Sequence, residues 1–212
     1  MRLVLASASP RRAGLLRAAG FTFETFPVDV DETVRPGEGA YAYVRRLAME
    51  KSARALEMLD HGPPKGGHYV RDDVVQDVRG DLVQEVRGDV VVIGADTAVV
   101  VHDEILGKPR DAAEAERMLR RLSGRRHEVL TGVSVRRVNV ERGGVETTVV
   151  ECLALIDADV SWYVASGEGR DKAGAYAIQG LASRFMARIE GSYSNVVGLP
   201  VHTVHKLLRD LR

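Results

Sequence analysis

The sequence predicts an α/β protein built around a mixed β-sheet. Apolar strand-like runs alternate with amphipathic helix-like segments along nearly all of the 212 residues, and this alternation is typical of α/β folds. Short polar segments between strand-like runs, such as His102-Asp103-Glu104, also predict hairpins. Hairpins make neighbouring strands antiparallel, so the sheet cannot be purely parallel. With 45% hydrophobic residues, the chain is expected to form one domain over residues 1–212.

The first predicted strand and helix flank a polar turn. Leu3–Ala6 is a short apolar run, and residues 7–12 (SASPRR) follow it directly. Ser9 is a good N-cap, Pro10 suits the first helical position, and Gly20 suits the helix end. A helix N-terminus presents unpaired N–H groups, to which this turn adds two hydroxyls and two guanidinium groups. The turn is therefore suited to phosphate oxygens. The alternative is an ordinary capped helix with a solvated basic face.

The later elements are predicted from their periodicity. Aromatic and polar residues alternate over Phe21–Phe26, as in a half-buried strand, and Tyr41–Leu59 has helical spacing. Val90–Ile93 is a continuous apolar run that predicts a buried central strand. The remaining elements are a hairpin of 98–101 with 105–106, a helix over 112–122, a hairpin of 129–138 with 145–150 turning at 142–144, a helix over 157–165, a polar loop over 192–200 and a helix over 200–211.

A segment at about residues 61–89 is set apart by repetition. A cluster of Gly and Pro residues over 62–67 precedes two similar eight-residue units, Val70–Asp77 and Val78–Glu85, and a third unit begins at Val86. Such a unit is too short for a helical solenoid repeat. We interpret the segment as a duplicated insertion, with an adapter for a partner as the alternative.

Composition and charge exclude several classes of protein. The 30 Lys and Arg residues balance the 30 Asp and Glu residues, so no overall field favours binding to nucleic acid or to an acidic membrane. No apolar run approaches the roughly 20 residues that span a bilayer, and we expect no signal peptide. The single cysteine, Cys152, cannot form an internal disulfide and is expected in the core. These features predict a soluble cytoplasmic protein.

Candidate catalytic oxygens follow two of the strand-like runs. Asp96 comes just after Val90–Ile93, and ligands of open α/β sheets bind outside the carboxyl ends of strands. A carboxylate there can deprotonate a water molecule or hold a divalent cation. The alternative is a turn aspartate that caps the following segment. Glu32, after the expected second strand, offers another hard oxygen ligand.

Lysines and one amide complete the set of candidate side chains. Lys108 lies on a short turn between glycine and proline, where a solvated lysine is an equally good interpretation. Lys51 faces either a cleft or solvent from the long helix. Lys172 and Gln179 belong to a segment rich in small residues, and the amide can read the edge of a base. Together these groups match metal-assisted attack on a nucleoside polyphosphate. The chain lacks a P-loop motif, and its histidines lack zinc-ligand spacing.

In their order along the chain, the motifs resemble those of the Maf family of nucleoside triphosphate pyrophosphatases. The resemblance covers nearly the whole chain outside the insertion and rests on Ser7–Arg12, Glu32, Glu50-Lys51, Ala95-Asp96-Thr97, Gly107-Lys108-Pro109, Thr131 and Asp171–Gly180. It implies an elongated mixed sheet flanked by helices, with two lobes and a central cleft, similar to the inosine triphosphatase fold. It also implies release of a nucleoside monophosphate and pyrophosphate, a Mg²⁺ or Mn²⁺ cofactor, and commonly a homodimer.

The resemblance further implies a role for individual side chains. Asp96 is similar to the general base of the family, and Asp96 and Glu32 are similar to its metal-binding positions. The positions similar to those that set base choice are Arg11, Thr97 and Gln179. The positions similar to those that bind phosphate are Ser7, Ser9, Arg12, Lys51, Lys108 and Lys172.

Three short motifs favour the branch of the family that acts on dTTP and UTP. These are Ser-Pro-Arg-Arg, Ala-Asp-Thr and Ile-Gln-Gly, whereas the branch acting on 7-methyl-GTP typically has Trp, Asp-Gln and Ser-Glu-Gly at these places. An amide can donate to and accept from the carbonyl and N3–H edge of a pyrimidine. The alternatives are a pyrophosphatase for another modified nucleotide and a nucleotide-sensing, non-catalytic regulator of septum formation.

Overall fold

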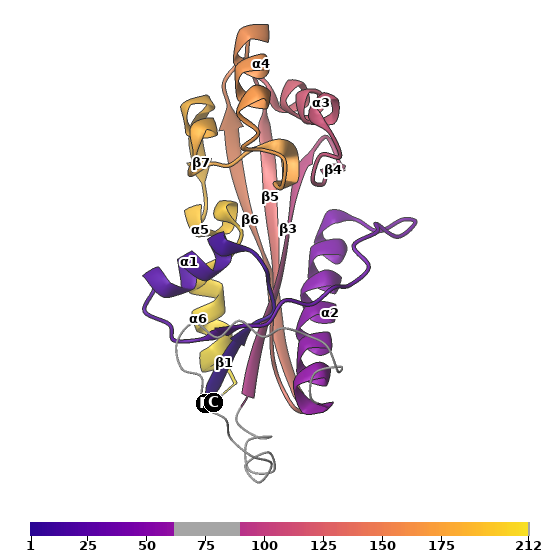
Figure 1. Ribbon diagram of the computed structural model, residues 1–212, viewed down its shortest axis with the longest axis vertical. Helices are drawn as coiled ribbons and strands as arrows, with labels where there is room; N and C mark the ends of the chain where they lie inside the picture. Colours follow the sequence, from indigo (N-terminus) through magenta and orange to yellow (C-terminus); the bar gives the residue numbers. More distant parts are fainter. Residues whose placement is uncertain (62–89, 212) are drawn as a thin grey trace.

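The computed structural model in Figure 1 is elongated along three long strands. These are β3 (Val90–Val101), β5 (Arg126–Arg137) and β6 (Val140–Cys152). The structure describes residues 1–61 and 90–211. The predicted repetitive insertion therefore lies outside the described residues, apart from position 61, where a helix ends.

The described strands form one seven-stranded mixed sheet, which confirms the predicted fold class. Its order is β2 (Glu24–Thr25), β1 (Arg2–Leu5), β3, β5, β6 and β7 (Met186–Glu190), with β4 (Glu104–Leu106) also paired to β3. β1 is parallel to β2 and β3, and the remaining pairs are antiparallel. The mixed character follows from the two hairpins, β3–β4 and β5–β6.

One edge of β3 has a gap between its two partners. β1 pairs with β3 from Val90 to Ile93, and β4 pairs from Val99 to Val101. Along the described chain, residues 94–98 have no strand partner on this edge, whereas β5 pairs with them on the other side. The gap exposes polar backbone and side chains in the middle of an otherwise buried strand.

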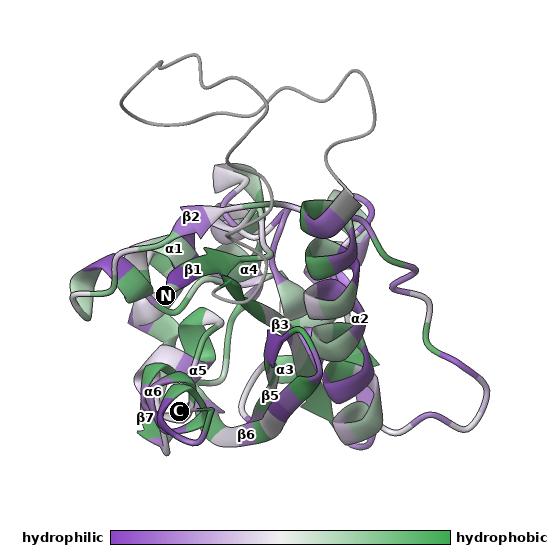
Figure 2. Cartoon of the chain, turned by 90° about the horizontal axis from the view of Figure 1, so that it is seen from below, coloured by the Kyte–Doolittle hydropathy of each residue, from purple (hydrophilic) through white to green (hydrophobic). Residues whose placement is uncertain are grey.

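Helices cover both faces of the sheet and its far end. Figure 2, which looks along the long axis, shows α2 (Ala40–His61) on one side of the strands and α1 (Pro10–Ala18), α5 (Tyr193–Val197) and α6 (Val201–Arg209) on the other. At the far end lie α3 (Ala112–Leu122), α4 (Asp157–Ser166) and the short 3₁₀ helices η1 (Ala173–Ala175) and η2 (Leu181–Phe185).

Four apolar core clusters stabilise the described residues, and the two largest lie towards opposite ends of the long strands. One core packs β1 and β3 against α1 and α6, and includes Leu5, Leu16 and Leu207. The other packs α3 and α4 against the opposite end of the long strands, and includes Leu119 and Tyr163. Cys152 belongs to this second core, as expected. The gap in the edge of β3 lies between the regions that the two cores stabilise.

Two glycines allow α2 to approach the sheet closely. A Cβ at Gly94 of β3 would lie 2.2 Å from the carbonyl oxygen of Ala48, and a Cβ at Gly132 of β5 would lie 2.1 Å from that of Val44. Isolated glycines within strands commonly mark such contacts. Asp96 pairs with Gly132 across the sheet, so the close approach occurs beside this carboxylate.

Gly94 also explains why the predicted end of the central strand is wrong. β3 does not end at Ile93 but continues without interruption to Val101. Gly94 is needed for contact with α2 rather than for a turn. Asp96 therefore lies in the middle of a strand, and the gap in the edge, rather than a strand terminus, exposes it.

The predicted hairpin turn at residues 142–144 is also wrong. β5 and β6 pair as far as Arg137 and Val140, so the turn lies earlier, and residues 142–144 are within β6. Gly143 leaves room there for the Arg45 guanidinium, whose carbon would lie 2.4 Å from a Cβ at this position. The glycine pair that suggested a turn instead receives a side chain from α2.

Two further segments differ from their predictions. Only Glu24–Thr25 pairs as a strand within the expected 21–26, while Phe21 and Phe23 pack against the core near α1. The polar loop expected over 192–200 contains the helix α5, whose N-cap Ser192 accepts from the Asn195 N–H. Side-chain capping thus makes a helix of a segment whose polar residues suggested a loop.

Candidate active site

All eleven predicted site residues line one cleft at the gap in the edge of β3. Its volume is about 410 Å³, and its walls come from the turn after β1, the loop before α2, β3 and the segment 171–179. The predicted residues on these walls are Ser7, Ser9, Arg11, Arg12, Glu32, Lys51, Asp96, Thr97, Lys108, Lys172 and Gln179. Tertiary folding therefore brings together side chains from six separate parts of the sequence.

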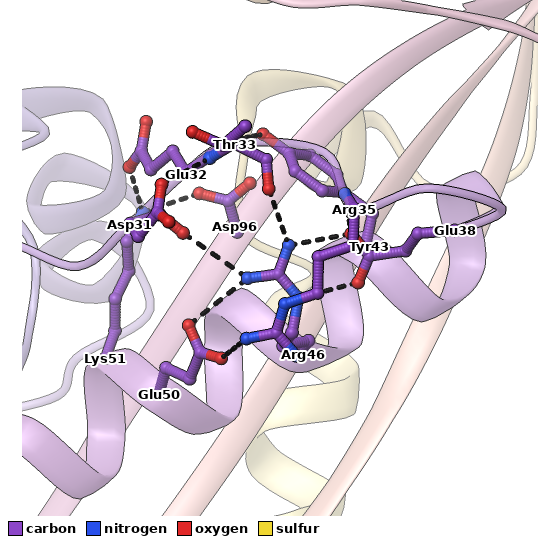
Figure 3. Close-up of polar contacts among 10 residues, drawn as sticks. All are labelled: Asp31, Glu32, Thr33, Arg35, Glu38, Tyr43, Arg46, Glu50, Lys51 and Asp96. Carbon is purple, nitrogen blue, oxygen red and sulfur yellow. Dashed lines mark hydrogen bonds and ion pairs between the residues drawn. The ribbon is translucent and has the colours of Figure 1, made fainter.

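Asp96, Lys51 and Glu32 form the charged centre of the cleft (Figure 3). The Lys51 ammonium donates to Asp96 Oδ1 and to Glu32 Oε1, each at 2.6 Å. Asp96 and Lys51 are each only 8% exposed, so their ion pair is weakly screened by water. Asp96 Oδ2 accepts no hydrogen bond from the described residues, which leaves it available to a ligand in the cleft.

The close packing of α2 places Lys51 at this centre. Gly94 lies against Ala48 and Ser52, which flank Lys51 on the helix. Asp96 is two residues beyond Gly94 and therefore projects from the same face of β3. The lysine thus faces the cleft rather than solvent, which resolves the two alternatives for its position.

Glu32 is a more exposed carboxylate at the mouth of the same centre. Burial alone would raise the pKa of Glu32, but the hydrogen bond and charge of Lys51, together with Lys108 and Arg12, hold this pKa below its usual value. The Lys108 ammonium is 3.7 Å from Glu32 Oε2 and is largely solvated. Glu32 is therefore ionised at neutral pH.

Arg46 fastens the loop that carries Glu32 to α2, as Figure 3 shows. Its guanidinium donates to both carboxylate oxygens of Glu38, at 2.6 and 2.7 Å, and to the backbone carbonyls of Asp31 and Thr33. It also reaches Glu50 one turn along the helix at 3.3 Å. Sequence analysis did not identify Arg46, because nothing in the sequence around Arg45 and Arg46 distinguishes a loop anchor from a solvated side chain.

The turn after β1 has the predicted capped geometry. The Ser9 hydroxyl accepts from the Arg12 N–H at 3.4 Å, and Pro10 occupies the first turn of α1. The Ser7 hydroxyl accepts from the Ser9 N–H at 3.2 Å. Both serines thus shape the turn as well as line the cleft.

Arg12 is occupied mainly by protein acceptors. Its guanidinium donates to the carbonyls of Gly198 at 2.7 Å and Ala95 at 2.9 Å, and to the hydroxyls of Thr97 at 3.1 Å and Ser7 at 3.3 Å. Burial lowers the pKa of Arg12, and the nearby Asp96 opposes that effect. Four of its five N–H groups are therefore used to join α1, β3 and the end of α5, which leaves one for a ligand.

The opposite wall contains Gln179, Lys172 and an ion pair. Asp171 accepts from Lys172 and also lies 3.4 Å from Arg11, so it links this wall to α1. The side-chain amide of Gln179 is exposed in the cleft and makes no hydrogen bond to residues 1–61 or 90–211. Thr97 instead has an engaged hydroxyl, which lies 3.0 Å from that of Thr131. Gln179 is thus the predicted base-choice residue whose side chain is freest to contact a ligand.

A family model described as Maf-like protein matches residues 2–211. This chain belongs to the Maf-like protein family. A dTTP/UTP pyrophosphatase of Anaeromyxobacter sp. (strain Fw109-5) is 49% identical, over 98% of this chain and 88% of the relative. That of Shewanella oneidensis is 44% identical over 99% and 98%, and that of Symbiobacterium thermophilum is 44% identical over 98% and 92%.

The side chains of this Maf-like protein supply only part of the ligand set that a small divalent cation needs. Among the described residues, no group of three or more His, Cys, Asp and Glu side chains is arranged to hold a metal ion. Glu32 and Asp96 nevertheless bring two carboxylates to one ammonium. Mg²⁺ at phosphate sites needs only one or two carboxylates, because substrate phosphates and water supply its other ligands. The two carboxylates therefore suit a cation that arrives with a polyphosphate.

None of the helices in the described part of the chain combines the length and apolar character needed to cross a membrane.

Proposed function

We propose that this protein hydrolyses dTTP and UTP to the nucleoside monophosphate and pyrophosphate, the activity that the names of its relatives state for them. The convergence of Asp96, its lysine partner and a phosphate-suited turn on one cleft carries the proposal. Electrostatic stabilisation of a polyphosphate needs cations around a site where one carboxylate stays available to activate water. This cleft contains both.

The basic side chains and the helix N-terminus are assigned to the triphosphate. Ser7 and Ser9 lie at the start of α1, where the helix dipole favours anions. Lys108 and Lys172 lie on the surrounding walls of the cleft, and Arg12 retains one N–H for a phosphate oxygen. Lys51 is already committed to two carboxylates, so it balances their charge as well as that of the phosphates.

Asp96 is assigned the role of general base. Lys51 holds Oδ1, and Oδ2 is left to accept a proton from a water molecule in the cleft. That water attacks the α-phosphorus, and the bond from this phosphorus to the oxygen bridging to the β-phosphate breaks. Pyrophosphate leaves, and the proton from water remains on Asp96 until it is lost to solvent.

A Mg²⁺ or Mn²⁺ ion is proposed to bind with the substrate at Glu32 and Asp96. Such an ion offsets phosphate charge and polarises a phosphoryl oxygen when it is bound. Support comes from the pair of carboxylates at the mouth of the phosphate turn and from the lowered pKa of Glu32.

The base is proposed to lie against Arg11, Thr97 and Gln179. The unpartnered Gln179 amide supports direct contact with the pyrimidine edge, since it can both donate and accept. Arg11 is half-buried beside Asp171, from where it can approach a base carbonyl. Thr97, whose hydroxyl is engaged by Arg12, is better suited to fix the position of that arginine.

We further propose a cytoplasmic homodimer that acts without nucleic acid. A net charge of zero and the single buried cysteine support the absence of nucleic acid and the reducing compartment. The homodimer is supported by the family resemblance alone.

A panel of nucleoside triphosphates, assayed for pyrophosphate release with and without Mg²⁺, tests the function. We expect dTTP and UTP to be hydrolysed fastest and only with the cation present. Faster hydrolysis of 7-methyl-GTP or inosine triphosphate would contradict the assigned branch. Asp96→Asn should lower kcat by about 10²- to 10⁴-fold while nucleotide binding persists. Nucleotide binding without hydrolysis in the unaltered protein would favour the regulator instead.

A further inference from the structure

The geometry points to Tyr163 and Glu168 as positioning residues for base choice, because together they hold both ends of the turn that carries Gln179. This inference rests on the proposed function, since that function assigns Gln179 to the base. The two residues come from the end of α4, in the lobe remote from Asp96. Neither lines the cleft.

The turn itself is a short backbone loop with Gln179 near its tip. The Gly180 N–H donates to the Ala177 carbonyl at 3.1 Å, which makes Ile178 and Gln179 the two central residues. Ala177 and Ile178 are buried, whereas Gln179 is exposed in the cleft. Because the Gln179 amide has no partner among the described residues, only the backbone of this turn determines where it lies.

Tyr163 and Glu168 form a bracket around this turn. The Tyr163 hydroxyl accepts from the Ala177 N–H at 3.1 Å and donates to Glu168 Oε2 at 2.8 Å. Glu168 Oε1 accepts from the Leu181 N–H at 2.9 Å. One continuous chain of hydrogen bonds therefore joins the residue at the start of the turn to the residue just after it.

Packing shows that the bracket fits closely against the turn. A Cβ at Gly180 would lie 2.0 Å from Glu168 Oε1, so the carboxylate rests on the glycine backbone. The end of α4 delivers Glu168 through Gly167, which adopts a φ of 72° that favours glycine. Gly180 thus leaves room for the carboxylate, and Gly167 allows the backbone turn that delivers it.

The Tyr163 phenol stays protonated over the physiological pH range. Burial, together with the Glu168 hydrogen bond, raises the pKa of Tyr163 well above its usual value. The phenol therefore stays a donor to Glu168 and an acceptor from Ala177. Selective base contacts need side chains held within about 0.5 Å, and a fixed backbone turn provides such precision for an otherwise free amide.

Tyr163→Phe tests the bracket, because the ring keeps its edge-to-face packing with Phe185 while the hydroxyl is lost. Val150→Ala is the matched control, since it removes methyl groups from the same core and leaves the hydrogen bonds of the bracket in place. We expect faster backbone hydrogen exchange over residues 176–183 in Tyr163→Phe than in Val150→Ala. The two variants are compared at temperatures that lie the same number of degrees below their respective Tm values. Equal protection in both variants would overturn the inference, whatever the enzyme hydrolyses.

Selectivity provides the second readout. The selectivity ratio is kcat/KM for dTTP divided by kcat/KM for dGTP. In Tyr163→Phe this ratio should fall about five- to tenfold, as expected for a weakened hydrogen bond to the base. It should approach the ratio measured for Gln179→Ala. Val150→Ala should keep the wild-type ratio. A wild-type ratio in Tyr163→Phe, with a lowered ratio in Gln179→Ala, would overturn the positioning role.

Variants of Glu168 separate a positioning role from general support of the lobe. Glu168→Gln keeps a carbonyl oxygen for the Leu181 N–H, and its amide N–H can donate to the Tyr163 hydroxyl, so this variant should largely retain the ratio. Glu168→Ala should match Tyr163→Phe. Equal ratios for Glu168→Ala and wild type would overturn the bracket. If the unaltered protein hydrolysed neither dTTP nor UTP, the proposed function would fail, while hydrogen exchange would still decide whether the bracket holds the turn.

Discussion

Lys51 and Asp96 form a buried ion pair, with Nζ of Lys51 2.6 Å from Oδ1 of Asp96. Asp96 lies in the middle of β3 and not at its end. The pair exists because α2 lies almost in backbone contact with β3 at Gly94. Each of the two charges therefore needs the other, because a buried charge without its partner destabilises the folded state. The candidate catalytic centre is therefore also a point of structural vulnerability.

Lys51→Met should both inactivate and destabilise the protein. It leaves the Asp96 carboxylate buried without its partner, at a cost of about 3 kcal/mol in the free energy of unfolding. Denaturant unfolding and a pyrophosphate-release assay measure the two effects. The double variant Lys51→Met/Asp96→Asn should regain part of the stability and no activity. A double variant as unstable as Lys51→Met would contradict the assigned pairing.

Gly94→Ala should destabilise the protein by about 2 kcal/mol or more, because the new Cβ would meet the Ala48 carbonyl oxygen at 2.2 Å. The helix must then move away from β3, so Lys51 withdraws from Asp96 and activity falls as well. Gly144→Ala is the matched control, since its Cβ would meet only a Thr203 methyl group at 4.0 Å. Equal Tm values for the two variants would show that α2 does not require a glycine at position 94.

The Glu38–Arg46 pair should make stability depend on pH in acid. The Arg46 hydrogen bonds are the main cause that lowers the pKa of Glu38 to about 2. Glu38 in the unfolded chain has the higher, ordinary value of about 4.3. Its contribution is therefore complete above that value and is lost as the pH falls towards 2.

Glu38→Gln should flatten the stability profile in that pH window, as urea unfolding at several pH values would show. Glu57→Gln is the control, because Glu57 forms an exposed pair with Arg54. Glu38→Gln should also weaken activity, since Arg46 then holds the loop of Glu32 less firmly. An unchanged profile in Glu38→Gln would remove the pair from the acid response.

His127 should cause a second loss of stability at mildly acidic pH. It is buried beside Tyr176, whose hydroxyl lies 2.8 Å from Nε2, and burial lowers the pKa of His127 to about 4. The unfolded state, with a histidine pKa of about 6.5, binds the proton first. Stability is therefore complete above pH 6.5 and falls by up to about 3 kcal/mol as the pH decreases to 4.

His127→Gln should remove this slope between pH 6.5 and 4, measured as the free energy of unfolding. His205→Gln, on the exposed face of α6, should leave the slope as it is in the wild type. The same slope in His127→Gln as in the wild type would assign the effect to another group.

Periodicity predicted the elements whose environment is uniform along their length. The helices near 41–59 and 112–122 and the β3–β4 hairpin are present with small changes of boundary. The wrong predictions lie at glycines and serines, because each of these residue types occurs in a sequence for two different structural reasons. Gly94 and Gly143 are packing contacts rather than turns, and Ser192 begins a helix rather than a loop. Only the neighbouring element distinguishes these causes.

The candidate site shows the same division. The chemical types at the site were evident from motifs, and all eleven predicted residues line one cleft. Their individual roles were less evident. Arg12 was expected to bind phosphate, yet four of its N–H groups bind protein acceptors. Arg46, Tyr163 and Glu168 were missed because they act through backbone groups that no side-chain pattern reveals.

The sequence by itself determined the α/β class, the order of most elements and the set of charged, hydroxyl and amide groups available for chemistry. These follow from local periodicity and from residue identity. Tertiary structure alone decided which groups meet: the gap that exposes Asp96, the approach of α2 that brings Lys51 to it, and the bracket that holds the turn of Gln179. The physical reason is that electrostatic and hydrogen-bonding interactions depend on distance through space, and these partners lie on separate elements whose packing sets that distance.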